Sequence, residues 1–293
     1  MAGSTSIGDG GAGAASQLSD AQGVAVDRLG NVYIADAGAH RVRKVNTSGA
    51  ILTLAGDGTP GFSGDGGRSD LARLNAPYGV AADSAGNVYV ADLGNHRVRK
   101  ITPEGTISTV AGTGDKGDLG DGGSATSAQL TSPRNLAFDS AGNLYISDFE
   151  AHRIRKVTPD GLIRTVAGTG VAGNRGDGGT ALQAELAYPA GIVIDPFGIL
   201  YIADSGNSRV RQVTNGIMNP APLGTVVFNL PTGVATDNLG NLYIAEAGAR
   251  RVWKRTIATN TVSVILGGQS NFNPIPVLDT ARDIAMSARG DLY

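Results

Sequence analysis

Three histidines are the side chains of this sequence best suited to hold a metal ion. They are His40, His96 and His152, and the chain has no others. Successive histidines are 56 residues apart, and each lies in the same kind of segment. Three imidazoles that converge on one point, with water as the fourth ligand, would form a catalytic zinc site. Whether these three can converge depends on the fold that holds them.

Two series of acidic residues recur at similar intervals and could carry acid–base chemistry. The first follows an apolar run in each copy of the segment and consists of Asp27, Asp83, Asp139, Asp195 and Asp237. The second follows the next apolar run and consists of Asp36, Asp92, Asp148, Asp204 and Glu246. An acid in every copy is typical of a part that every copy needs, such as a turn cap or an ion pair with Arg41 or Arg43. We therefore interpret both series as structural.

The segment is an internal repeat that occurs six times. The first copy reads GVAVDRLGNVYIAD, and the copies begin near residues 23, 79, 135, 191, 233 and 283. Each copy contains one tyrosine, and these are Tyr33, Tyr89, Tyr145, Tyr201, Tyr243 and Tyr293. A GDGG motif precedes the first four copies, and its aspartates are Asp9, Asp65, Asp121 and Asp177.

Each copy shows signals for four short antiparallel strands. In the first copy, residues 24–26, 32–35, 41–45 and 51–55 are runs rich in apolar and β-branched residues, separated by turn-forming residues. Four strands in each repeat of 42–56 residues describe a propeller blade. A single blade cannot bury both of its faces, whereas blades stacked around an axis do so. We therefore predict an all-β fold, a six-bladed β-propeller that occupies residues 1–293 as a single domain.

The linkers and the chain ends refine this prediction. After the fourth strand of the second copy, Ala125, Ala128 and Leu130 are spaced for one short helical turn that covers the blade edge. The GDGG glycines are expected in bends with positive φ. The chain stops inside the second strand of the sixth copy. We expect an incomplete last blade and a longer parent protein.

These repeats resemble a known family. The best copy, PYGVAADSAGNVYVADLGNHRVRK over residues 77–100, resembles the NHL repeat. The linker over residues 165–186 is similar to linkers of bacterial NHL proteins and of the NHL region of teneurins. The resemblance implies a six-bladed propeller that binds a protein or another ligand, although a minority of the family are enzymes and others bind RNA. It also implies a bacterial protein in an extracellular or periplasmic location, with a cytoplasmic location as the alternative.

The geometry of a propeller keeps the three histidines apart. Strands in a blade are about 4.8 Å apart, so the third strand begins roughly 10 Å farther from the axis than the first. Histidines at the start of third strands in different blades therefore cannot share a metal ion, because nitrogen ligands lie at about 2.1 Å. We predict that each histidine hydrogen-bonds a neighbouring turn, and that the protein has no metal site and no cofactor.

Ligand binding is best placed at the entrance of the central channel, where the first strands begin. The entrance positions are Gln22, Tyr78, Arg134, Ala190, Thr232 and Arg282. The lyases and gluconolactonase-type enzymes among related propellers carry histidines, carboxylates or asparagine there, and these six positions hold none. Because they vary between copies, all except Ala190 are candidate ligand-binding residues, and the alternative is that they are variable, solvated loop residues. This favours a non-catalytic recognition module that binds a protein, peptide or glycan on one face or at the channel mouth, with a lyase or lactonase-type enzyme as the alternative.

A basic stripe on the predicted third strands supports a second alternative, RNA binding. It includes Arg97, Arg99 and Lys100, and other copies contain equivalent residues. These bases alternate with apolar residues and are matched by the recurring acids. Aromatic residues that could stack on bases are few, and Trp253 is the only tryptophan. We therefore do not expect a nucleic acid partner.

Composition restricts the function further. A net charge of −2 gives no general attraction to nucleic acid or anionic membranes. The absence of cysteine excludes disulfides and thiolate metal sites. No apolar run reaches the roughly 18 residues of a membrane span, and one aspartate in each GDGG motif supplies too few oxygens for calcium. We expect a monomer. Two linkers that lack GDGG, residues 215–230 and 267–280, are irregular loops where binding could also occur.

Overall fold

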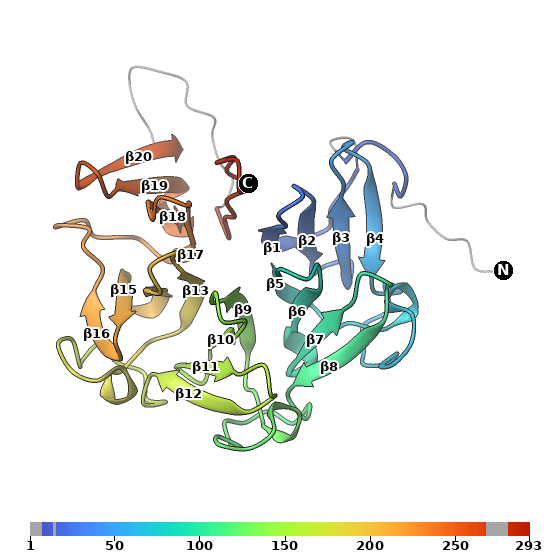
Figure 1. Ribbon diagram of the computed structural model, residues 1–293, viewed down its shortest axis with the longest axis horizontal. Coiled ribbons are helices and arrows are strands. Elements are labelled where there is room, and N and C mark those ends of the chain that lie inside the picture. Colours follow the sequence, from blue (N-terminus) through green and yellow to red (C-terminus); the bar gives the residue numbers. More distant parts are fainter. Residues whose placement is uncertain (1–7, 14–15, 268–280) are drawn as a thin grey trace.

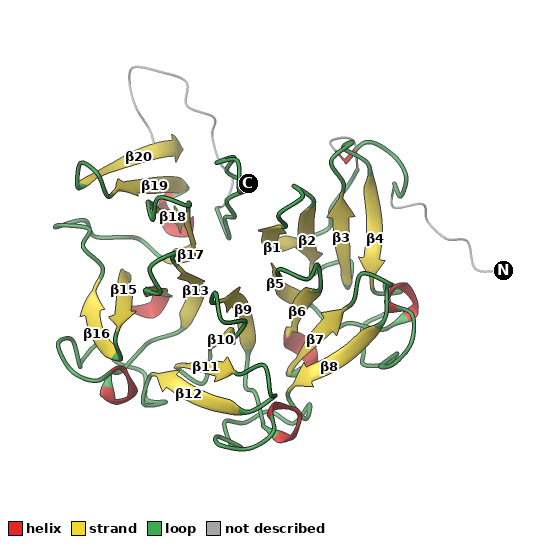
Figure 2. Cartoon of the chain, in the orientation of Figure 1, coloured by secondary structure: helices red, strands yellow, loops and turns green. Residues whose placement is uncertain are grey.

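The described residues form five four-stranded antiparallel sheets that stand around a common axis (Figure 1). The structure is a computed structural model and describes residues 8–13, 16–267 and 281–293. In each sheet the strands follow chain order, with the first strand nearest the axis and the fourth at the rim (Figures 1 and 2). This is the β-propeller arrangement that the repeats predict.

The strand bounds repeat closely from sheet to sheet. Blade one contains β1 (Ala21–Val26), β2 (Val32–Asp36), β3 (Arg41–Val45) and β4 (Ile51–Ala55). Blade two contains β5 (Pro77–Ala82), β6 (Val88–Asp92), β7 (Arg97–Ile101) and β8 (Ile107–Ala111). Blade three contains β9 (Pro133–Phe138), β10 (Leu144–Asp148), β11 (Arg153–Val157) and β12 (Ile163–Ala167). Blade four contains β13 (Pro189–Ile194), β14 (Leu200–Asp204), β15 (Arg209–Thr214) and β16 (Ile217–Pro220). Blade five contains β17 (Pro231–Thr236), β18 (Leu242–Glu246), β19 (Arg251–Thr256) and β20 (Thr261–Gly267).

Short 3₁₀ turns connect the strands and cover the blade edges. They are η2 (Ser69–Leu71), η3 (Leu93–Asn95), η4 (Ala125–Ser127), η5 (Ala181–Gln183), η6 (Ser205–Asn207) and η7 (Ala247–Ala249). The helical turn predicted near Ala125 is confirmed as η4, and Ala125, Ala128 and Leu130 are all buried there. No helix within the described residues is long and apolar enough to cross a membrane.

The first acidic series closes the hairpin between the first and second strands. Asp27 accepts hydrogen bonds from the backbone N–H groups of Leu29 and Asn31, each at 2.9 Å, and from the Tyr33 hydroxyl at 2.9 Å. Burial raises the pKa of Asp27, but these hydrogen bonds outweigh it, and the pKa lies below the usual 3.8. The prediction that this aspartate caps a turn is confirmed, whereas its hydrogen bond with the repeated tyrosine was not predicted.

The core lies between neighbouring blades. One cluster joins Ala35 and Val42 of blade one to Val80 and Val90 of blade two, and similar clusters follow around the ring. Near the axis the inner strands approach closely, because a Cβ added at Gly79 would lie only 2.4 Å from the carbonyl oxygen of Arg134. Glycine at this position allows the narrow spacing of the first strands.

A complete sixth blade is not seen in the described residues. Residues 281–293 contain one isolated bridge, between Met286 and Leu292, instead of a four-stranded sheet. This C-terminal segment lies between β17 and β1 (Figure 1). The Thr232 hydroxyl donates to the carbonyl oxygen of Ala281 at 3.0 Å, and the N–H of Val24 donates to Asp283 at 3.2 Å. The segment thus connects blade five to blade one.

Candidate functional site

The three histidines are structural side chains, as predicted. Each has φ between 52° and 54°, in the left-handed region. The Nδ1 atoms of His40 and His152 accept hydrogen bonds from the N–H groups of Ala76 and Tyr188, each at 3.1 Å. His96 Nδ1 lies 2.7 Å from the carbonyl oxygen of Thr131. Each histidine therefore links its own blade to the start of the next.

The second acidic series is buried and also structural. Asp92 accepts hydrogen bonds from the N–H of Asn75 at 2.7 Å, from Asn95 Nδ2 at 2.8 Å and from Arg99 Nη1 at 3.3 Å. Burial raises the pKa of Asp92 to about 6 despite these contacts. Across the whole described part of the chain, no three His, Cys, Asp or Glu side chains are grouped so that they could hold a metal ion.

The basic stripe is buried at its centre and half-buried at its ends, which weakens the case for RNA binding. Its central arginines are fully buried, and they are Arg43, Arg99, Arg155 and Arg211. Each pairs with the aspartate of the preceding GDGG motif, for example Arg99 with Asp65 at 2.6 Å. The glycines on both sides of Asp65 have positive φ, as expected for a bend. The expected pairing of the second acidic series with third-strand arginines is confirmed at Arg99 and Asp92, which lie 3.3 Å apart. The GDGG aspartates were expected only in bends, and their ion pairs with the buried arginines were not predicted.

Blade five replaces this ion pair with an aromatic pair. The linker before it lacks GDGG, and Trp253 occupies the position of the buried arginine. The Trp253 and Phe228 rings meet edge to face at a centroid distance of 5.8 Å. Trp253 Nε1 donates to Glu246 at 2.5 Å. The irregular linker of residues 215–230 thus fills core space at Phe228, while residues 268–280 lie outside the described residues.

The candidate ligand-binding residues at the entrance form two bonded pairs, with Thr232 outside them, and Gln22 is buried like Thr232. Arg282 Nη1 donates to Gln22 Oε1 at 2.9 Å, and Gln22 Nε2 donates to Asp20 at 2.7 Å. Arg134 Nη2 donates to the Tyr78 hydroxyl at 2.6 Å. Thr232 is buried, and its hydroxyl donates to the carbonyl oxygen of Ala281. Its side chain is therefore part of the packed interior.

Two further aromatic residues join Arg134 at the mouth. The Arg134 guanidinium carbon lies 4.6 Å from the centre of the Tyr78 ring and 4.1 Å from that of Phe149. Phe149 contacts Tyr188 at a centroid distance of 5.1 Å, and Tyr188 is 45% exposed. We call Tyr78, Arg134, Phe149 and Tyr188 the mouth cluster. Arginine stacked between rings is held rigidly while its remaining N–H groups stay available.

Sequence reasoning did not identify Phe149 and Tyr188. The other described blades carry Ala37, Leu93, Ser205 and Ala247 at the position of Phe149. At the position of Tyr188 they carry Asp20, Ala76, Ser132 and Leu230. A large aromatic residue where most copies have a smaller one was the signal that could have found them.

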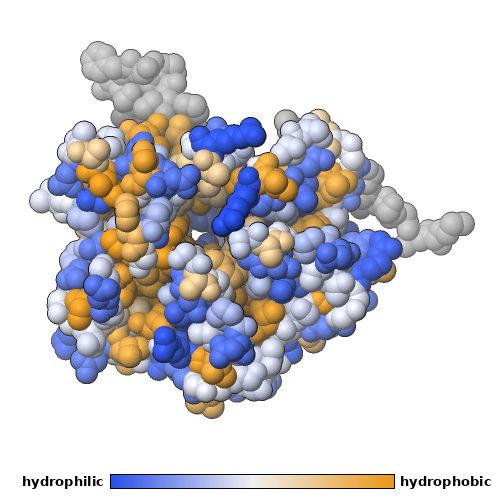
Figure 3. Space-filling model, in the orientation of Figure 1, coloured by the Kyte–Doolittle hydropathy of each residue, from blue (hydrophilic) through white to orange (hydrophobic). Residues whose placement is uncertain are grey.

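The channel begins just below the mouth and is crossed by two side chains. Asn135 and Asp283 occupy the position that is glycine in the other blades, as at Gly79. Asn135 Nδ2 lies 3.5 Å from Asp283 Oδ2, and its Oδ1 accepts from the N–H of Ile192 at 3.2 Å. Below this pair is a cavity of about 200 Å³, lined by the first strands. Figure 3 shows strongly hydrophilic side chains beside the central opening of the ring.

Asp283 should make stability depend on pH. Burial raises its pKa to about 7, although the N–H groups of Val24 and Ile284 and the charge of Arg134 oppose this. Its pKa in the folded state exceeds the usual 3.8, so the folded state favours the protonated acid. The stability that Asp283 contributes is therefore complete below about pH 4 and is lost as the pH rises through about 7.

We expect Asp283→Asn to remove this dependence. Relative to the wild type, the variant should gain about 1–3 kcal/mol in free energy of unfolding between pH 5 and pH 8, because the amide cannot ionise. Urea unfolding at several pH values measures the difference. A constant difference across this range would show that Asp283 does not titrate there.

The sequence matches known families over much of its length. The teneurin NHL domain family matches residues 58–117 and 113–174, and the NHL repeat family matches residues 18–45 and 186–213. Human NHL repeat-containing protein 2 is 33% identical over 216 residues, which cover 65% of this chain and 29% of that protein. Human teneurin-1 is 29% identical over 233 residues, which cover 71% of this chain and 8% of that protein. The chain therefore spans less than a third of the length of these relatives.

The fold also matches solved structures. A gluconolactonase from Xanthomonas campestris superposes with a TM-score of 0.65 at 16% sequence identity, covering 94% of this chain and 82% of the other. At this identity the likeness establishes the fold alone. Together, the repeats, the five blades and the family matches show that the chain belongs to the NHL repeat and teneurin NHL domain family of β-propellers.

Proposed function

We propose that this propeller is a non-catalytic recognition module that acts as a monomer and binds a protein, peptide or glycan at the channel mouth. One observation carries the proposal. Polar residues that recur in every blade are bonded into the framework, whereas the mouth cluster and the Gln22–Arg282 pair differ from blade to blade. Side chains that the framework does not need, held on a rigid scaffold, are suited to ligand binding.

Substitution at the mouth tests this proposal. We expect immobilised Tyr188→Ser protein to lose at least about 90% of the ligand that wild-type protein captures from an array of peptides and glycans, which is a tenfold loss of affinity. The matched control is Leu29→Ser, because Leu29 is 75% exposed in the turn at the opposite end of β1. Equal capture by wild type and Tyr188→Ser, with a loss in Leu29→Ser, would place the ligand on the opposite face.

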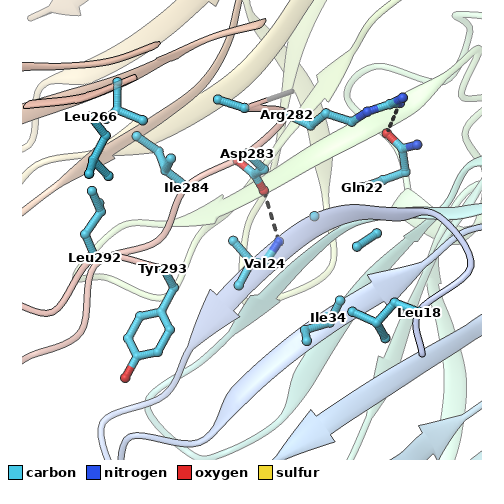
Figure 4. A pocket seen from close by; sticks show the side chains of 14 residues that line it. Leu18, Gln22, Val24, Ile34, Leu266, Arg282, Asp283, Ile284, Leu292 and Tyr293 are labelled. Atoms are coloured by element: carbon cyan, nitrogen blue, oxygen red, sulfur yellow. Dashed lines mark hydrogen bonds between the residues drawn. The ribbon is translucent and has the colours of Figure 1, made fainter. Parts of the chain in front are cut away.

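We also propose that the ring has six blades in a single domain. The C-terminal segment provides the inner part of the sixth blade, and a groove of about 330 Å³ lies beside it (Figure 4). Leu266, Ile284 and Leu292 line one side of the groove, and Leu18 and Ile34 line the other. This apolar groove is where the outer strands of a sixth blade would pack.

The alternative function is an enzyme that uses the channel. The observation in its favour is the acid–amide pair of Asp283 and Asn135, because acids with a raised pKa in a cavity are often functional. Stoichiometric zinc or calcium in the purified protein, lost together with a hydrolytic or lyase activity in Asp283→Asn, would favour the enzyme over the recognition module.

The resemblance to bacterial NHL proteins and teneurins supports an exported, extracellular or periplasmic location, and we propose this location for the protein. Fractionation of the source cells with an antibody against the propeller tests it. Recovery of the protein only in the cytosol would refute it.

A further inference from the structure

Two arginines face each other across the channel mouth. The inner strands contact one another in the order β1, β5, β9, β13 and β17, and the C-terminal segment lies between β17 and β1. Strand β9 and the C-terminal segment therefore stand opposite each other, with two inner strands between them on either side. Their side chains Asn135 and Asp283 meet across the axis at 3.5 Å. The residues that precede these two, Arg134 and Arg282, consequently flank the mouth from opposite sides.

Arg134 is held in place by uncharged groups. Its guanidinium lies between the Tyr78 and Phe149 rings and donates to the Tyr78 hydroxyl. None of its hydrogen bonds to the described residues ends on a carboxylate. A guanidinium has five N–H donors in a planar fork that matches a carboxylate in a bidentate pair. The stacked Arg134 therefore offers unused donors in a fixed orientation.

Arg282 offers a second set of donors on the other side. It is exposed, and the hydrogen bond that holds it goes to the amide oxygen of Gln22. Asp20 accepts from the amide nitrogen of Gln22 and so turns the amide oxygen toward Arg282. The buried arginines of the blades differ, because Arg99 and its equivalents form ion pairs with the GDGG aspartates. The molecule thus neutralises its buried arginines but leaves the two at the mouth facing neutral acceptors.

The surroundings of the two arginines indicate the kind of ligand. Tyr188 and Leu230 are 45% and 47% exposed, and Phe149 lies beside Tyr188. Tyrosine, phenylalanine and arginine are enriched in protein interfaces, where they supply most of the binding energy. An aromatic and apolar rim around two cations therefore suits a protein surface that carries an acidic side chain.

We infer that the mouth binds an acidic peptide segment of a protein partner, with a carboxylate held between Arg134 and Arg282 above the Asn135–Asp283 pair. This inference rests on the proposed function and specifies its ligand. Charge-assisted, bidentate hydrogen bonds to the two guanidiniums provide the recognition. Asp283 follows Arg282 in the chain, and Arg134 is the charged group that acts on its carboxylate. When Asp283 ionises, it weakens the attraction of this site for an anion.

The test uses two matched probes, an acetylated all-glutamate hexapeptide and its all-glutamine counterpart, each with a fluorescent label. By fluorescence anisotropy we expect the glutamate peptide to bind at least about tenfold more tightly than the glutamine peptide. Arg134→Gln and Arg282→Gln should each lower the affinity for the glutamate peptide by about tenfold or more. Neither variant should change the affinity for the glutamine peptide. Arg68→Gln is the control, because Arg68 is exposed and pairs with Asp70 away from the mouth.

The affinity measured over a series of pH values provides a second readout. It would not change with pH in this way if the two arginines had only a structural role. The affinity of wild-type protein for the glutamate peptide should fall as the pH rises from 6 to 8, and Asp283→Asn should bind with little change across this range. Circular dichroism confirms that each variant is folded. Since Arg282 is exposed, Arg282→Gln keeps the test valid if Arg134→Gln unfolds.

The outcomes separate this inference from the proposed function. If both peptides bind equally and Tyr188→Ser abolishes the binding, the mouth is a recognition site but the acidic ligand is wrong. If neither peptide binds while oligoglucuronate or single-stranded RNA binds with the same arginine dependence, the peptide assignment is overturned. If every probe binds independently of Arg134, Arg282 and Tyr188, or none binds, the inference is wrong. Array capture that is also insensitive to Tyr188→Ser would then overturn the proposed function as well.

Discussion

Replacing Arg99 by methionine is expected to lower the free energy of unfolding by about 3–5 kcal/mol. Arg99 is fully buried and contacts Asp65 at 2.6 Å and Asp92 at 3.3 Å. Methionine occupies a similar volume but leaves the buried carboxyl of Asp92 without a cation. Breaking a buried ion pair from one side costs far more than the pair contributes, because the remaining charge stays out of water.

The pH dependence of this effect identifies its cause. Burial already raises the pKa of Asp92 to about 6, and loss of Arg99 raises it further. The destabilisation by Arg99→Met should therefore be larger at pH 8 than at pH 5. At pH 8 the unfolded state carries the ionised carboxylate, whereas the folded variant must either bury this charge or keep Asp92 protonated. Arg68→Met is the matched control, because its ion pair with Asp70 is exposed to solvent and should change the free energy of unfolding far less than Arg99→Met does. Similar losses in the two variants would show that the buried pair has no special role.

Blade five shows that the fold tolerates another solution to the same packing problem. There the arginine and its GDGG partner are both absent, and Trp253 and Phe228 fill the space together. A paired replacement is what a physical interaction predicts, because either member alone would leave a buried charge or a void. This is the strongest indication that the GDGG aspartate serves the framework and not a ligand.

Extending the chain after Tyr293 with a copy of residues 244–267 is expected to raise the thermal midpoint by about 5–10 °C. Tyr293 corresponds to Tyr243, so the added segment supplies the rest of a second strand and the two outer strands. These strands would cover the apolar groove formed by Leu18, Ile34 and Leu266. Burial of apolar surface contributes about 25 cal/mol per Å², and each kcal/mol shifts the midpoint by roughly 2–4 °C in a domain of this size.

Blade five is the appropriate donor of the extension. Its Trp253 needs no GDGG aspartate, and the linker before the sixth copy also lacks that motif. The control extension carries aspartate in place of the apolar residues copied from positions 252, 264 and 266, and it should give no stabilisation. An equal midpoint for both extensions would contradict a sixth blade at this position.

The fold could be predicted well from sequence because each structural residue recurs. The strands of blade one begin and end within three residues of the predicted runs. The link from His40 to the next blade followed from its position in the repeat. The ion pair between Asp65 and Arg99 did not follow, because its partners are 34 residues apart and meet only after the linker folds back.

The candidate site was only partly predictable for a related reason. Gln22, Tyr78, Arg134 and Arg282 were found as entrance residues, but repeat comparison could not say which of them pair. Phe149 comes from a different turn and meets Arg134 only in three dimensions. A side chain present in one blade has no periodicity, and its partners depend on packing that sequence spacing does not specify.

The central claim is that recurring polar residues build the blades while the non-recurring residues at the channel mouth bind the ligand. Amide chemical-shift mapping of the labelled protein with the all-glutamate hexapeptide tests it most directly. We predict that the largest shifts fall near Gln22, Tyr78, Arg134, Tyr188 and Asp283. Largest shifts on the outer strands, or at the turns of His40, His96 and His152, would contradict the account.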